Sequence, residues 1–137
     1  MSFYRLVATV GLVIAIAVLV TAARLHPDPR GTGTHEQLGI PPCGFLAEHG
    51  VPCISCGMTT AFTAMAHLQP GLALRANPFG TFLFLVVLVS PFWFVHSLVT
   101  DRDPLRILHT RRAAIVLPVL GLLLLINWGV MVLLALR

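Results

Sequence analysis

The chain has 137 residues, of which 57% are hydrophobic and only 10% are charged, and its formal net charge is +4. Soluble domains carry about 25% charged residues, so this composition excludes an ordinary soluble fold. All the basic residues are arginines, which stand mostly at the ends of apolar runs and not among aromatic residues. We therefore expect no nucleic-acid partner.

Three apolar runs are long enough to cross a bilayer as helices. They cover about residues 6–23, 78–100 and 113–136, and none contains a formal charge. A helix rises about 1.5 Å per residue and the hydrocarbon core is about 30 Å thick, so each run can span it, the first with the least margin. The sequence predicts an all-α membrane protein with residues 1–137 as a single domain. We expect it in the lipid bilayer of the cytoplasmic membrane.

The first run also has features of a secretory signal peptide. One arginine, Arg5, precedes it, and the small residues Thr21, Ala22 and Ala23 resemble a cleavage site. A single arginine is a weak basic region for such a peptide. We therefore expect the run to be retained as a signal anchor.

The connection between the first and second runs begins with an open segment. Residues His26–Gln37 are rich in Pro, Gly and Thr, which predicts an irregular surface loop. One helical turn is expected over Phe45–His49, ending at Gly50. A longer helix is expected over Ser55–Gln69, because Ser55 is a good N-cap and Pro70-Gly71 stops a helix.

The segment at about 41–69 is therefore predicted to be a helical hairpin that does not cross the membrane. A helix of about fifteen residues is too short to span the bilayer, and it indicates a re-entrant or interfacial segment packed against the three spans. A fourth full span over Ile40–Leu68 is the alternative. The residues that oppose it are Pro41, Pro42, Glu48 and Pro52.

The arginines also suggest an orientation. The short connection 101–112 contains four of them, Arg102, Arg106, Arg111 and Arg112. Short basic loops stay in the cytoplasm, which places the N-terminus inside and the cysteine-bearing connection outside. Three other arginines at span ends oppose this bias: Arg24, Arg75 and Arg137.

All three cysteines, Cys43, Cys53 and Cys56, fall between residues 43 and 56. A Cys-x-x-Cys pair with a third cysteine upstream offers three thiolates to a metal ion, zinc or iron, and His49 or His67 is a candidate fourth ligand. The usual second pair of ligands is missing, so the sequence alone leaves the metal site as one reading among three.

The second reading is thiol chemistry, and the third is packing. A Cys-x-x-Cys pair at a helix N-terminus favours a reactive thiolate, and a loop outside the cytoplasm permits a disulfide, either Cys43–Cys53 or Cys53–Cys56. The chain lacks the strand–Cys-x-x-Cys–helix order of thioredoxin folds. Cysteine also packs as a small apolar residue, and the run 56–61 suits a close helix contact.

Residues 43–80 resemble a family of small bacterial membrane proteins catalogued as domain of unknown function 2752. Its members carry an upstream Cys, a Gly, then Pro-Cys-x-x-Cys-Gly-x-Thr-Arg-Ala and a later Asn-Pro pair; the matching positions here are Cys43, Gly50, Pro52–Phe62 and Asn77-Pro78. Ile54 and Thr60 depart from the pattern, since the family has Pro and Arg there. The resemblance implies a membrane protein with a characteristic cysteine loop and no settled biochemical activity.

The rest of the sequence gives little support to an enzyme. No nucleophile motif surrounds the serines, and haem ligation by His67, His96 or His109 lacks an attachment motif. Asn127 and Trp128, inside the third run, are expected to be an interhelical hydrogen-bonding residue and a packed aromatic. We expect a structural or accessory subunit that binds other membrane protein subunits or copies of itself. The alternative is a metal-binding or thiol-redox protein that uses the cysteines.

Overall fold

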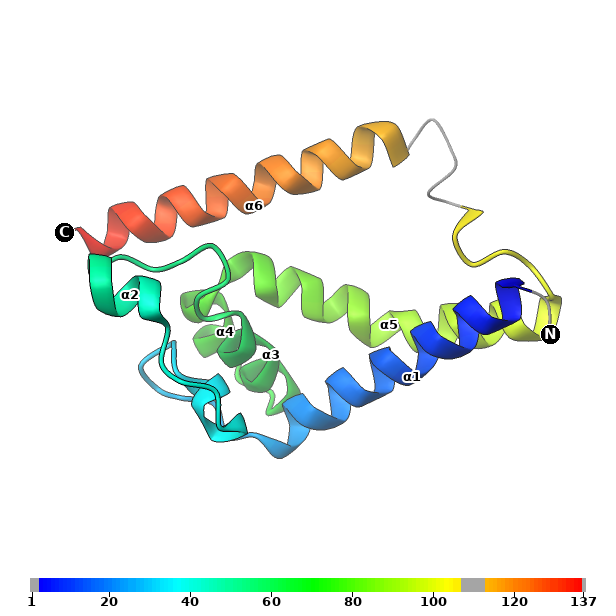
Figure 1. The fold of residues 1–137 in the computed structure, drawn as a ribbon, viewed down its shortest axis with the longest axis horizontal. Helices are drawn as coiled ribbons and strands as arrows, with labels where there is room; N and C mark the ends of the chain where they lie inside the picture. Colours follow the sequence, from blue (N-terminus) through cyan, green and yellow to red (C-terminus); the bar gives the residue numbers. More distant parts are fainter. Residues whose placement is uncertain (1–2, 107–112, 137) are drawn as a thin grey trace.

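The structure is a computed structural model that describes residues 3–106 and 113–136, and these residues form helices and connecting turns without a strand. Figure 1 shows three long helices and a group of short ones between the first and second of them. In chain order the elements are α1 (Phe3–Arg24), the 3-10 helix η1 (Thr34–Leu38), α2 (Gly44–His49), α3 (Met58–Ala66), α4 (Pro70–Ala76), α5 (Pro78–Thr100) and α6 (Ala113–Ala135).

The three long helices are the predicted spans. Helices α1, α5 and α6 have mean hydropathies of 2.7, 2.2 and 2.4 over their most apolar stretches, and each is long enough to cross a membrane. The predicted all-α class is confirmed, as are three helices able to span a membrane. Helix α1 begins at Phe3 and α6 ends at Ala135, so the boundaries differ slightly from the predicted 6–23 and 113–136.

Small residues let α1 and α5 approach closely. Ala8, Ala15 and Ala22, spaced seven apart on one face of α1, are all buried. A side chain at Gly11 would overlap the Phe94 ring of α5. Lipid gives helices no hydrophobic reason to associate, so such close contact is a main source of their attraction.

Helices α1 and α5 run in opposite directions. The pairing is closed at one end by an ion pair between Arg5 Nε and Asp101 Oδ1 at 2.9 Å. The chain between the two helices, residues 25–77, lies at the other end, and we call it the head (Figure 1). The helical part of the head contains a small alanine-rich core: Ala61, Ala64, Ala73 and Ala76.

Helix α3 ends earlier than predicted. The sequence indicated one helix over 55–69, but α3 ends at Ala66 and Pro70 begins a second helix, α4. Leu68 turns the chain in the left-handed conformation, with φ 57°, and Gln69 N donates to Ala64 O at 2.8 Å. Proline was expected to stop a helix, but here it occupies the first turn of the next one, where its missing N–H has no partner to lose.

The predicted turn at 45–49 is present as α2, and it ends at Gly50 in the left-handed conformation with φ 69°. The loop 26–37 is more ordered than predicted, because its last residues belong to η1. Thr34 within it is fully buried and its hydroxyl lies 2.8 Å from the Thr60 hydroxyl on α3. This contact ties the loop to the head.

Four residues named in the sequence analysis, one as a candidate haem ligand and three for the orientation, lie outside the described residues: His109, Arg111, Arg112 and Arg137.

Candidate functional site

The sulfur atoms of Cys43, Cys53 and Cys56 converge at one place in the head. All three lie within 4.8 Å of one another. The Sγ atoms of Cys53 and Cys56 are 2.8 Å apart, and those of Cys56 and Cys43 are 3.4 Å apart. Cys56 is buried, the other two are half-buried, and all three are free thiols. We call this group the sulfur cluster.

Two short local structures create the cluster. Cys43 stands just before α2, at its N-cap. Cys53 and Cys56 bracket a tight turn in which Cys56 N donates to Cys53 O at 3.1 Å, and Cys53 N lies 3.0 Å from Cys56 Sγ. Because the turn folds back on itself, both of its thiols face the same side as Cys43. This is why residues ten apart in the sequence can act as one group.

Gly57 connects the cluster to α3, and its backbone requires glycine. Its φ is +76°, in the left-handed region that other residues avoid. A Cβ here would also overlap the carbonyl of Ala76 and approach the Gly31 carbonyl at 2.9 Å. Three segments of the head therefore meet at this position with no room for a side chain.

Asn77 is fully buried and holds the turn from the other side. Its Nδ2 donates to the carbonyl of Cys56 at 3.0 Å, and its Oδ1 accepts from Gly80 N at 2.8 Å. Asn77 is also the N-cap of α5, so one side chain joins the start of the second span to the cysteine turn.

Helix α6 reaches the same region through two consecutive residues. Asn127 Oδ1 accepts from Phe79 N at 3.2 Å, and Asn127 Nδ2 donates to Asn77 Oδ1 at 3.3 Å. The predicted interhelical hydrogen-bonding role of Asn127 is confirmed. Trp128 does more than pack, since its indole Nε1 donates to the carbonyl of Pro52 at 2.9 Å. Pro52 directly precedes Cys53.

The two thiols of the turn differ in acidity. Desolvation raises the pKa of Cys53, but hydrogen bonds with Cys56, Ser55 and Cys43 together outweigh it and lower that pKa to about 7. Desolvation, followed by the hydrogen bonds with Cys53 and Cys43, raises the pKa of Cys56 to about 12. Near neutral pH about half of Cys53 is thus in the thiolate form, while Cys56 stays protonated.

The donor set fits a thiophilic metal ion. A Zn–S bond of about 2.3 Å and a tetrahedral angle imply sulfur atoms about 3.8 Å apart. The separations in the cluster, 2.8 Å, 3.4 Å and at most 4.8 Å, lie on both sides of that value. A disulfide has an S–S bond of about 2.05 Å and joins two sulfur atoms, so it would leave the third thiol out.

The predicted histidine ligands lie apart from this group. His49 stacks on Phe45 with ring centroids 4.5 Å apart, and its Nδ1 lies 3.3 Å from the carbonyl of Phe45. His67 Nε2 lies 2.8 Å from the carbonyl of Leu25. His96 lines a cavity in the last turns of α5, away from the head, so His67 and His96 do not meet.

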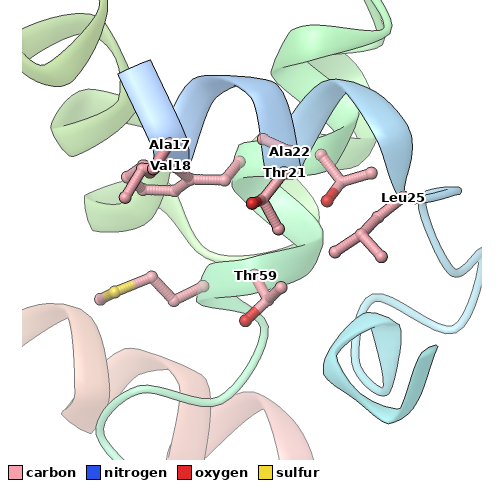
Figure 2. A pocket seen from close by; sticks show the side chains of 9 residues that line it. Ala17, Val18, Thr21, Ala22, Leu25 and Thr59 are labelled. Carbon is pink, nitrogen blue, oxygen red and sulfur yellow. The ribbon is translucent and has the colours of Figure 1, made fainter. Parts of the chain in front are cut away.

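The cavities of the described residues are not centred on the sulfur cluster. One of about 370 Å³ lies between α1 and α3, with Val18 and Thr21 on one side and Thr59 on the other (Figure 2). Its lining is almost wholly apolar. Thr63 also lines it, and its buried hydroxyl has no hydrogen-bond partner among the described residues. This groove offers packing surface and no reactive group.

Fold and site together have the features of a multi-pass helical membrane protein with a cysteine-bearing head. The family model described as protein of unknown function (DUF2752) matches residues 43–90, from the first cysteine to the middle of α5. The resemblance noted in the sequence is thereby confirmed for that segment. No curated protein and no solved structure matches the chain.

The sequence indicated the three cysteines but not the residues that hydrogen-bond to their turn. The Asn-Pro pair at 77–78 was noticed as part of the family pattern, and nothing in it indicated a bond to Cys56. The Trp128 contact joins residues 76 positions apart. The available signal was the scarcity of polar side chains within the third run, where Asn127 stands alone as an amide.

Proposed function

We propose that this protein is a membrane protein of the bacterial cytoplasmic membrane that binds one thiophilic metal ion, with zinc as the first candidate and iron as the second. The ligands are the thiolates of Cys43, Cys53 and Cys56. One observation carries the proposal: three sulfur atoms from two separate turns lie within 4.8 Å of one another.

The convergence favours a metal ion over the other readings of the cysteines. Packing alone does not require three thiols to face one another, and a disulfide would use two of them. Thiolates are the ligands that zinc, copper(I) and iron–sulfur sites prefer. The fourth position of a tetrahedral site is left to solvent or to His49, whose ring would have to leave Phe45.

The site would lie on the outer side of the membrane, with the head as a re-entrant or interfacial segment. The support is the distribution of charge: Arg5 pairs with Asp101 at the end of the helix pair opposite the head, and Arg102 and Arg106 follow there. Basic residues in short loops favour the cytoplasmic side. Labelling of Cys53 by a membrane-impermeant thiol reagent on whole cells, after chelation and reduction, tests this orientation.

Metal analysis of the purified protein tests the proposal. We expect about one zinc or iron per chain by plasma mass spectrometry, and loss of that ion in each of the variants Cys43→Ser, Cys53→Ser and Cys56→Ser. The matched control is Ile54→Ala, which alters an exposed side chain in the same turn and should keep the ion. His49→Ala shows whether the histidine completes the site.

Two results would contradict the proposal. Three free thiols and no metal in protein purified without chelators would leave packing as the role of the cysteines. Two thiols lost to oxidation with no metal bound would instead indicate a disulfide or a redox pair, which the pKa of about 7 at Cys53 would suit.

We propose as a second function that the protein is an accessory subunit of a membrane assembly, as a homo-oligomer or with other subunits. The observation that favours it is α6: none of its most apolar 18-residue stretch is buried within the described residues. A Cβ at Gly121 or Gly129 would meet nothing within 4 Å, so at these two glycines the surface of α6 is open to the close approach of another helix. Native mass spectrometry from mild detergent tests this, and a strictly monomeric, partnerless species would contradict it.

A further inference from the structure

Helix α6 makes few contacts with the other described helices. Among the helices that the structure describes, it packs only against α5. Even there a cavity of about 360 Å³ lies between the two helices, lined by apolar residues of both and by Asn127. In Figure 1 the ribbon of α6 approaches the head near its C-terminal end. Polar contacts are therefore a large part of what fixes its position.

Two of those polar contacts lead to the sulfur cluster. The indole Nε1 of Trp128 donates a hydrogen bond to the carbonyl of Pro52, the residue before Cys53, at 2.9 Å. Asn127 reaches the side chain of Asn77 at 3.3 Å. Asn77 in turn holds the carbonyl of Cys56 at 3.0 Å.

The backbone carbonyls on both sides of the Cys-x-x-Cys turn are thus fixed by the same small network. One is bonded to α6 directly and the other through one intermediate side chain.

We propose that α6 and the metal site regulate each other. An ion bound to the three thiolates strengthens the docking of α6, and the loss of α6 from its docked position weakens the binding of the ion. This inference rests on the proposed metal-binding function. Asn127 and Trp128 act as positioning residues: Trp128 bonds Pro52 at the start of the turn, and Asn127 reaches the turn through Asn77.

The geometry explains why the two events must be linked. Binding an ion requires the sulfur atoms of Cys53 and Cys56 to move apart, from 2.8 Å toward about 3.8 Å. Rotation of the two side chains supplies part of this movement, and the remainder falls on the backbone of a short, internally hydrogen-bonded turn and shifts the flanking carbonyls. Any shift at Pro52 changes its bond to Trp128. The linkage is reciprocal by thermodynamic necessity, and such couplings commonly change affinity by about 5- to 150-fold.

The chain contains its own reporter for this coupling. It has two tryptophans, Trp93 in α5 and Trp128 in α6. Trp93 donates to the carbonyl of Pro104, whereas Trp128 donates to Pro52. The variant Trp93→Phe leaves the reporter at the head, and Trp128→Phe leaves the matched control at the far end.

The experiment titrates each metal-free, reduced, full-length variant with Zn²⁺ in detergent and measures bound zinc and tryptophan emission together. We expect the emission of Trp93→Phe to change in step with zinc binding, with saturation at one ion per chain. The emission of Trp128→Phe should stay constant while zinc binds. A merely structural role for Trp128 would produce no metal-dependent signal.

The reciprocal arm measures zinc affinity after α6 is loosened. Asn127→Leu and Trp128→Phe should each raise the dissociation constant for zinc by about tenfold, within the range of such couplings. The control Leu125→Val changes an exposed apolar residue on the same helix that does not line the cavity against α5, and it should leave affinity unchanged. Retained α-helical circular dichroism shows that the variants still fold.

The outcomes separate the two proposals. Zinc bound by Trp93→Phe with no change in emission, together with unchanged affinity in both α6 variants, would overturn the coupling and leave the metal site standing. No zinc bound by any form, including the wild type, would overturn both.

Discussion

Replacement of Gly57 by alanine tests the packing of the head most directly. Gly57 has φ +76°, and a Cβ there would overlap the Ala76 carbonyl and lie 2.9 Å from the Gly31 carbonyl. Both obstacles are backbone atoms, which cannot rotate away as a side chain could. The substitution must therefore separate α3 from α4 or from the loop at residue 31.

The expected loss of stability has two parts. A non-glycine residue in the left-handed conformation costs about 1–2 kcal/mol. Forcing an extra carbon into a well-packed site typically costs about 1–3 kcal/mol more. Gly57→Ala should therefore destabilise the protein by about 2–5 kcal/mol, a large fraction of the stability of a typical domain, which is about 5–15 kcal/mol.

Gly39 supplies a matched control. Its φ is +75°, nearly the same as at Gly57, but a Cβ there would meet nothing within 4 Å. Gly39→Ala should therefore show only the conformational part of the loss, about 1–2 kcal/mol. The difference between the two variants isolates the steric part at Gly57.

The assay is equilibrium unfolding in mixed micelles, followed by circular dichroism and by the accessibility of the buried thiol of Cys56. Gly57→Ala should unfold at lower denaturant than Gly39→Ala and expose Cys56 more readily. Equal destabilisation of the two variants would refute the close approach of three backbone segments at Gly57.

Three further predictions concern the thiols, the loop and the spans. In metal-free protein, the rate of alkylation of Cys53 should have its midpoint near pH 7 and that of Cys56 far above it, because the reactive thiolate forms above the pKa. Mass spectrometry of the labelled peptides measures both rates, and the same pH dependence at the two cysteines would contradict the prediction. Thr34→Val should cost about 1–3 kcal/mol, since it leaves the buried Thr60 hydroxyl unpaired and removes the acceptor of Asp28 N; Thr60→Val should cost less, because the Thr34 hydroxyl still accepts from Asp28 N, and the double variant should cost less than the sum. Additive losses in denaturant unfolding would argue against that bond. Ala8→Leu should cost about 1–3 kcal/mol by forcing α1 from α5, whereas a leucine on the exposed face of α1 should be neutral.

The spans were predictable because the signal that defines them is local. Uninterrupted apolar sequence is enough to specify a membrane helix, and the runs at 78–100 and 113–136 coincide with α5 and α6 to within one residue. The helix boundary at Pro70 was not predictable by the same means. Proline both stops a preceding helix and starts a following one, and the left-handed turn at Leu68 that decides between the two is a tertiary outcome.

The sulfur cluster was predictable in its members and not in its geometry. Spacing indicated that Cys53 and Cys56 belong together, and it left open whether Cys43 joins them. The answer depends on the turn before α2 and on Asn77, which are fixed by packing between segments distant in sequence. Trp128 illustrates the limit best, because a tryptophan in an apolar run gives no sign of the carbonyl that it will contact.

The attachment of α6 also fixes an order of assembly. During synthesis the chain emerges N-terminus first, so α1, the head and α5 are complete before α6 leaves the ribosome. The acceptors for Asn127 and Trp128, the Asn77 side chain and the Pro52 carbonyl, are presented only by a head that has already folded around its cysteines. The docking of α6 therefore depends on the preceding residues having reached their folded arrangement.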